Sequence, residues 1–517
     1  MSNRETALPS DEGSRRLLPV TAPPMKRYLT LLLSLLFVLP LPAQSRREAL
    51  LEYQARRRQA YTEFRDNYRK ACADFMRKRW EAFRAEAPVP VPERREPDIP
   101  VMKHPDAPSV PTQDRMPYDK VVDLPEPAPE MPDAPGIAET PVLPGKPAAG
   151  TDDAAPAVDV SRPFKFTFYG TGCSVSLAAK HRFNLASVQE NSVANAWEGV
   201  SRGSYDAVAA ECVALKKALG LNDWGYYDLV RTLADGFCGP KTNESVVLQS
   251  FLMAEAGYKV RMARGGGRLF LLLATDGQVY ARPYFNIDGQ VFYILDDVPR
   301  AASYNICNFT IPGERPLSLA MPAPPLFAQK PAAPAVRNFD GVVSTTVTVN
   351  RNLMDFYTNY PPCHWSVYAA TALTAPVRGQ LYPPLRAAVA GKGEREAAEL
   401  LLHYLHRAFP YKTDEAQFGV ERTLFAEEMY YYPYSDCEDR SILFARLVKD
   451  LLGLDVVLLY YPAHIATAVC FKGEVKGDYM QLGNKRYVIC DATYIGAGVG
   501  EAMPDLKRTP AQVVRID

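Results

Sequence analysis

The stretch Tyr431-Tyr-Pro-Tyr-Ser-Asp-Cys-Glu-Asp-Arg440 says most about how this chain folds. Ser435 is followed three residues later by Glu438, the spacing of a capping box, so we expect a helix to begin here. Cys437 then falls in the first turn, where unpaired backbone N–H groups and the helix dipole lower the pKa of a thiol. Three adjacent carboxylates oppose this effect, because like charge disfavours a thiolate. A reactive Cys437 therefore needs an imidazolium nearby.

A histidine and an aspartate further along the chain supply the missing groups. His464 begins the apolar run Ile465–Val469, and Asp491 ends the next expected strand, Arg486–Asp491. Strand ends lie at the rim of a sheet, so the imidazole can act as the base and the carboxylate can hold its tautomer. Either residue alone is more often structural than catalytic. The combination of a cysteine at a helix start with a histidine and an aspartate on successive strands is fairly specific for a Cys-His-Asp site.

Three motifs together resemble the core of the transglutaminase-like superfamily over roughly residues 395–510. They are Ser435–Arg440, Tyr461-Pro-Ala-His464 and Cys490-Asp-Ala-Thr-Tyr494, and the glycine-rich run Tyr494–Gly500 is similar to the end of this core in bacterial members. The resemblance implies a papain-like α+β fold, a helix on an antiparallel sheet, with no cofactor and no metal. It also implies acyl transfer through Cys437, His464 and Asp491, with water or an amine as acceptor. The oxyanion donor stays open between the Cys437 amide and an upstream Tyr or Gln.

Two globular blocks, residues 161–310 and 337–517, share one order of expected elements. In block one these are Arg231-Thr-Leu, a helix around 246–256, Gly257, and strands at 269–274 and 291–296. In block two they are Arg422-Thr-Leu, a helix around 440–452, Gly453, and strands at 465–471 and 486–491. A glycine after a helix is the usual C-cap. We therefore predict an internal repeat of two α+β domains.

Block one departs from the catalytic pattern. Lys241–Ser245 stands where Cys437 should match, Arg268 lies near the position of His464, and only Asp296 matches Asp491. Cys238 comes a few residues too early and is interpreted as structural. Block one is thus expected to be a degenerate copy that serves as a scaffold or a ligand-binding half.

The N-terminal third is not expected to fold as a domain. Residues 1–44 hold an extension and a signal peptide that begins at Met25, which is an alternative to Met1 as the true start. Residues 45–87 are expected to form an arginine-rich amphipathic helix, which leaves packing on a neighbouring domain, self-association and binding to an anionic envelope surface open. Proline-rich residues 88–160 and 311–336 are expected to be linkers. An uncleaved membrane anchor stays an alternative to export.

Composition narrows the function classes. The chain has 517 residues and a formal net charge of zero, so nothing favours a nucleic-acid partner. Its nine cysteines contain no CxxC pair, and the odd number leaves at least one thiol free. His403 and His406 share a helix face but lack further metal ligands nearby in sequence, and Gly265–Gly267 is expected to be a turn.

These observations predict an exported cysteine peptidase or amidase, periplasmic or secreted, that acts on peptide or protein substrates. Bacterial members of the resembling family are often hydrolases, so hydrolysis of peptide or isopeptide bonds is expected more than crosslinking. The alternative is a non-catalytic envelope protein in which both papain-like blocks bind or support other molecules. Substrate identity and oligomeric state do not follow from the sequence.

Overall fold

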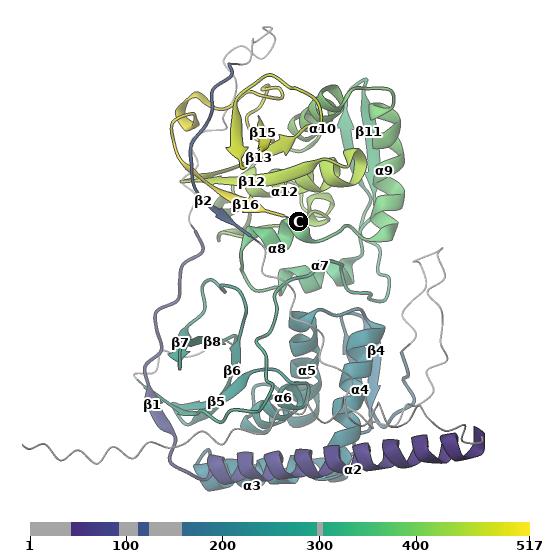
Figure 1. Ribbon diagram of the computed structural model, residues 1–517, viewed down its shortest axis with the longest axis vertical. Helices are drawn as coiled ribbons and strands as arrows, with labels where there is room; N and C mark the ends of the chain where they lie inside the picture. The colour runs from purple at the N-terminus through teal and green to yellow at the C-terminus, as the bar shows by residue number, and fades with distance from the viewer. Residues whose placement is uncertain (1–42, 93–111, 124–157, 297–302, 517) are drawn as a thin grey trace, which may run out of the picture. The chain divides into compact units, whose positions relative to one another are not determined.

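The computed structural model describes residues 43–92, 112–123, 158–296 and 303–516. The chain divides into two units, Met1–Thr62 and Glu63–Asp517, and both predicted blocks belong to the second unit. Within the described ranges the fold is α+β, with helices packed on largely antiparallel sheets, which confirms the predicted class (Figure 1). Nearly all of the predicted signal peptide, with both alternative start sites, lies outside the described residues. None of the described helices is long and apolar enough to span a bilayer.

The N-terminal helix is shorter than the helix predicted over residues 45–87. Helix α2 spans Ala43–Met76, and the indole N–H of Trp80 donates to the Met76 carbonyl at 2.9 Å just beyond its end. The chain then extends, and β1 (Glu81–Phe83) pairs antiparallel with β9 (Tyr304–Cys307). Pairing of β1 with the open edge of the block one sheet therefore outweighs the local helical pattern of the sequence.

The proline-rich stretch 88–160 is also more than a linker. Its described part contains β2 (Tyr118–Val122), which pairs in parallel with β16 (Ala511–Arg515) at the edge of the block two sheet. Met116 is buried in the same block. Residues 93–111 and 124–157 lie outside the described part. The prediction was wrong for β2 because its backbone gains hydrogen bonds from a partner strand far away in sequence, which the composition of the proline-rich stretch does not reveal.

Block one consists of helices followed by a sheet. Its elements are β3 (Phe164–Phe168), β4 (Thr171–Val175), α3 (Glu190–Val200), α4 (Ser204–Ala218), α5 (Asp223–Cys238), α6 (Asn243–Glu255), β5 (Val260–Gly265), β6 (Arg268–Ala274), β7 (Tyr284–Ile287), β8 (Gln290–Ile294) and β9. The strand order in its six-stranded sheet is β7-β8-β6-β5-β9-β1.

Block two repeats this plan. Its elements are β10 (Ala335–Phe339), β11 (Val343–Val347), α7 (Arg351–Thr358), α8 (Trp365–Ala370), α9 (Ala375–Val389), α10 (Glu394–Ala408), α11 (Asp414–Phe418), α12 (Cys437–Leu447), β12 (Asp455–Tyr461), β13 (His464–Cys470), β14 (Tyr479–Leu482), β15 (Lys485–Cys490) and β16. Its sheet has the order β14-β15-β13-β12-β16-β2, which has the same sequence of positions as block one, except that the edge strand β2 is parallel to β16 whereas β1 is antiparallel to β9.

Local signals in the sequence agree with much of this plan. Gly257 and Gly453 follow their helices with φ of 81° and 65°, as a glycine C-cap requires. The predicted turn at Gly265–Gly267 is the β5–β6 hairpin, since Gly265 pairs with Arg268. Two expectations were wrong. Each sheet contains one further strand after the strand that we expected to be last, namely β9 in block one and β16 in block two. Arg231 lies in α5 whereas Arg422 lies in a loop, so these two arginines are not equivalent.

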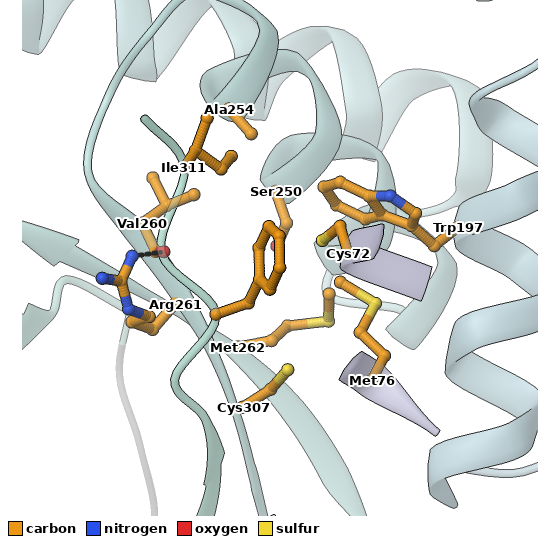
Figure 2. Close-up of a pocket in the computed structure, with 11 residues that line it drawn as sticks. Cys72, Met76, Trp197, Ser250, Ala254, Val260, Arg261, Met262, Cys307 and Ile311 are labelled. Carbon is orange, nitrogen blue, oxygen red and sulfur yellow. Dashed lines mark hydrogen bonds between the residues drawn. The ribbon is translucent and has the colours of Figure 1, made fainter. Parts of the chain in front are cut away.

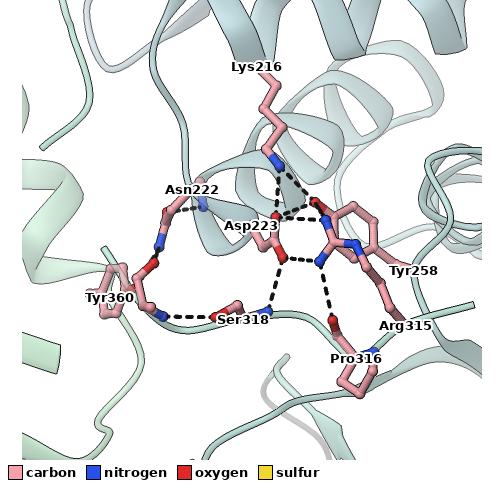
Figure 3. A network of polar contacts seen from close by, with 10 residues as sticks. Lys216, Asn222, Asp223, Tyr258, Arg315, Pro316, Ser318 and Tyr360 are labelled. Carbon is pink, nitrogen blue, oxygen red and sulfur yellow. Dashed lines mark hydrogen bonds and ion pairs between the residues drawn. The ribbon is translucent and has the colours of Figure 1, made fainter. Parts of the chain in front are cut away.

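The second proline-rich stretch, 311–336, packs against block one and is not a free linker. The backbone of Leu317 bonds to Ala274, and that of Arg315 bonds to Gly257. The Arg315 guanidinium reaches Asp223 at 2.5 Å, and Lys216 reaches the same carboxylate at 2.7 Å (Figure 3). Burial alone would raise the pKa of Asp223, but these cations lower it to about 2. Proline content did not reveal this packing, because the segment buries its apolar side chains against block one.

Two leucines in this stretch give a matched test of the packing. Leu317 is fully buried and Leu326 is 51% exposed. We expect Leu317→Ala to lower the free energy of unfolding by about 2–5 kcal/mol, because it leaves a cavity, and Leu326→Ala to change it by less than about 0.5 kcal/mol. Urea unfolding followed by circular dichroism measures both. Equal, small effects would mean that 311–336 is a linker after all.

Candidate active site

Helix α12 begins with Cys437, one residue later in register than the predicted capping box implies. Asp436 is the N-cap, and the Asp439 carboxylate accepts from the Asp436 amide at 3.3 Å. Ser435 is not the cap because its backbone forms a bridge with Tyr411. Its hydroxyl oxygen accepts instead from the Nε of Arg440 at 3.3 Å. Cys437 is therefore in the first turn, as predicted, but the capping residues are Asp436 and Asp439 instead of Ser435 and Glu438.

One hydrogen bond sets the helix against the sheet. The hydroxyl of Ser441 donates to the carbonyl of Ile465 at 3.0 Å. Ser441 lies one turn after Cys437 on the same helix face, and Ile465 follows His464 in β13. The helix start and the strand start are thereby brought to one end of the sheet. Sequence reasoning missed Ser441, although its spacing of four from Cys437 was a usable signal.

His464 and Asp491 are in direct contact. The imidazole Nε2 lies 2.9 Å from Oδ2 of Asp491, and the other carboxylate oxygen accepts from the amides of Thr493 and Tyr494 at 2.9 and 3.2 Å. Burial alone would raise the pKa of Asp491, but His464 and the two amides outweigh burial and hold this pKa below its usual value. Asp491 is therefore ionised near neutral pH and fixes the proton of a neutral imidazole on Nε2.

The structure describes a different partner for the cysteine. The Cys437 thiol donates to Oε2 of Glu438 at 3.6 Å. The Cys437 side chain is fully buried, whereas 9% of His464 is exposed. Of the three predicted residues, His464 and Asp491 are thus in contact. Cys437 lies at the start of the neighbouring helix, where its thiol is hydrogen-bonded to the Glu438 carboxylate. Because Nε2 of His464 is engaged, Nδ1 is the nitrogen left to take a thiol proton.

Two histidines on α10 support the same region. His406 Nε2 donates to the backbone carbonyl of Asp491 at 3.0 Å, and His403 Nε2 lies 3.3 Å from the Ala497 carbonyl. Burial lowers the pKa of His406 to about 4, so its ring is neutral at physiological pH. Sequence analysis considered this pair only as weak metal ligands. Their described hydrogen bonds show that they hold the chain on both sides of the Asp491 turn.

Carboxylates also gather before α12. The ligand oxygens of two sets lie within 4.8 Å of one another, namely Asp414 with Glu421 and Glu438, and Asp414 with Asp436 and Asp439. Carboxylate oxygens are ligands of hard cations, and among the described residues these two sets bring several such oxygens close together. Their negative charge favours the protonated thiol of Cys437.

Block one places other chemistry at the corresponding positions. Asn243 is the first residue of α6 and Arg268 the first of β6, as Cys437 and His464 are of α12 and β13. By the register of the β6–β8 pair, Asp296 has the same position relative to Arg268 as Asp491 has relative to His464 in the β13–β15 pair. Asn243 accepts from the Leu269 amide at 2.9 Å, and Arg268 donates to the Lys241 carbonyl at 3.2 Å. The predicted nucleophile and base are replaced by backbone-binding side chains.

No protein-family model, no curated protein and no solved structure matches this chain. Its function is therefore argued from the geometry of its own residues.

The neutral state of His406 predicts a pH dependence of stability. In the unfolded chain the imidazole takes up its proton near pH 6.5, but in the folded chain only near pH 4, so unfolding binds a proton between these values. The free energy of unfolding should therefore fall as pH drops from 6.5 to 4, by up to about 3 kcal/mol from this residue. His406→Gln removes the titrating group and can still donate to Asp491.

Denaturant titrations at pH 7.5, 6, 5 and 4.5 measure this effect. We expect the loss of stability across this range to be smaller in the variant than in the unaltered chain, whatever their difference at pH 7.5. Parallel profiles for the two proteins would contradict the burial of a neutral His406.

Proposed function

We propose that this chain is an exported cysteine-dependent acyl-transfer enzyme of the transglutaminase-like type, with Cys437 as nucleophile, His464 as base and Asp491 as the orienting carboxylate. Both blocks are then papain-like domains, and block one is a degenerate copy. The observation that carries the proposal is the 2.9 Å contact between His464 and a fully buried, ionised Asp491 beside the helix that starts with Cys437. A buried charge of this kind is costly unless a partner stabilises it, and here that partner is the imidazole.

The reaction follows from these positions. The Cys437 thiol turns from Glu438 to Nδ1 of His464 and gives up its proton. The thiolate attacks the carbonyl carbon of an amide, the C–N bond breaks, and the imidazolium returns the proton to the departing amine. Water then attacks the thioester, which releases a carboxylic acid and restores the thiol. Asp491 keeps the proton of the neutral ring on Nε2 and stabilises the imidazolium in both steps.

Hydrolysis of peptide or isopeptide bonds is the favoured outcome, since the resembling bacterial proteins are often hydrolases. Export by a signal peptide would place the enzyme in the periplasm or outside the cell. Its substrate would then be a peptide or protein of that compartment.

One observation favours the alternative of a non-catalytic envelope protein. Cys437 is fully buried and bonded to Glu438, which stabilises the thiol over the thiolate. Block one already has Asn243 and Arg268 in the nucleophile and base positions, and both serve local backbone contacts. A binding or scaffold role for both blocks would require neither thiolate nor imidazolium.

The thiol itself separates the two candidates. We expect iodoacetamide to modify Cys437 with an apparent pKa below the 8.5 of a free thiol, because His464 stabilises the thiolate. His464→Ala should slow the reaction at pH 7 at least tenfold, and Asp491→Asn should slow it less. Peptide mass spectrometry across pH 5–10 follows the modification of each cysteine separately.

Cys470 is the internal control in the same digest. It is partly exposed, and burial raises its pKa, so neither substitution should alter its slow labelling. A Cys437 that reacts no faster than Cys470, or that ignores the loss of His464, would favour the scaffold alternative.

Activity is tested with the mature chain on peptide amides and in amine-incorporation assays run side by side. Cys437→Ala should abolish turnover, whereas Cys363→Ala, a change of another buried cysteine in block two, should retain it. Equal turnover in both variants would refute a role of Cys437 in catalysis.

A further inference from the structure

A small cavity lined with sulfur lies between α2, α6 and the sheet of block one. Its volume is 20 Å³, enough for one ion or water and too small for an organic molecule. Four sulfur-bearing side chains line it, namely Cys72, Met76, Met262 and Cys307 (Figure 2). All four are at most 4% exposed, and none of the nine cysteines, which all lie in the described ranges, forms a disulfide.

The four side chains come as two facing pairs. Cys72 and Met76 are four residues apart on α2 and so lie on one face of the helix. Met262 of β5 is directly paired with Cys307 of β9, so their side chains leave the same sheet face, with Cβ atoms about 5 Å apart. All four belong to the core shared by the helices and this face of the sheet. A helical sulfur pair therefore opposes a cross-strand sulfur pair over the cavity.

We propose that these four sulfur atoms form a binding site for a single Cu(I) ion. Thiolates and thioethers are soft ligands, and soft ligands select Cu(I) over hard cations. Trp197, Phe309 and Ile311 add apolar side chains to the lining, and Ser250 and Arg261 also border the cavity, the latter paired with Glu314. On binding, one thiol releases its proton to solvent as the sulfur–copper bond forms, and the copper stays Cu(I). One thiolate with one Cu(I) is neutral overall, which suits a buried site.

The test uses the reduced mature chain under anaerobic conditions, with Cu(I) supplied as its complex with the coloured chelator bicinchoninate. The unaltered chain should remove one equivalent of copper per chain from the chelator. Met76→Leu with Met262→Leu preserves volume and should preserve the fold, but it removes both thioethers. We expect at least a tenfold loss of affinity in this variant, and loss of the tight equivalent in Cys72→Ala with Cys307→Ala.

Two controls use cysteines elsewhere. Cys173 and Cys212 are a second pair of buried cysteines in block one, and their double replacement by alanine should leave the copper equivalent intact. Cys437→Ala should also leave it intact, so the outcome is independent of catalysis. Failure of the unaltered chain to take copper from the chelator would overturn the proposal. So would equal affinity after the methionine changes, or loss of copper in either control.

Discussion

Strand register in the block two sheet is the constraint on which the candidate site depends. His464 and Asp491 meet because β13 pairs with β15 through Thr467 and Cys490. Both faces of this sheet are apolar and buried, since alternate residues of each strand belong to two separate core clusters. A slip of one residue would exchange these faces and separate the histidine from the aspartate. The cores thus hold the polar pair in place.

The start of α12 is a balance of opposing electrostatic effects. The helix dipole and a nearby imidazole favour a thiolate, whereas Glu438 and the other buried carboxylates favour the thiol. In the structure the Cys437 thiol donates to Oε2 of Glu438 at 3.6 Å. An enzyme requires His464 to draw this thiol away from the carboxylate, whereas a scaffold does not.

Block one has a direct structural connection to block two. Asn222 donates to the hydroxyl of Tyr360 at 2.8 Å (Figure 3). This hydroxyl in turn donates to the Leu319 carbonyl at 2.6 Å. Tyr360 leads into α8, which packs against α12. The proline-rich stretch 311–336 therefore joins both blocks, and block one contributes through these contacts to the position of the helix that begins with Cys437.

Each sheet receives its edge strand from the N-terminal part of the chain. β1 covers β9 in block one, and β2 covers β16 in block two. The two sheets thus agree in position at this edge, although β1 is antiparallel to its neighbour and β2 is parallel.

The sequence by itself determined the features that arise from short-range rules. These are a helix that begins within one residue of the predicted start and has Cys437 in its first turn, the strands that begin with His464 and end before Asp491, the hairpin turns and the glycine C-caps, because capping, turn chemistry and hydrophobic period all act within a few residues. Only the tertiary structure decided that β1 and β2 are strands and that 311–336 is packed, since backbone hydrogen bonds and burial come from distant partners. The same holds for Ser441 and His406, whose acceptors are backbone carbonyls far away in sequence. It also holds for the Cys437 thiol, whose bond to an adjacent glutamate depends on which charges surround the buried helix start.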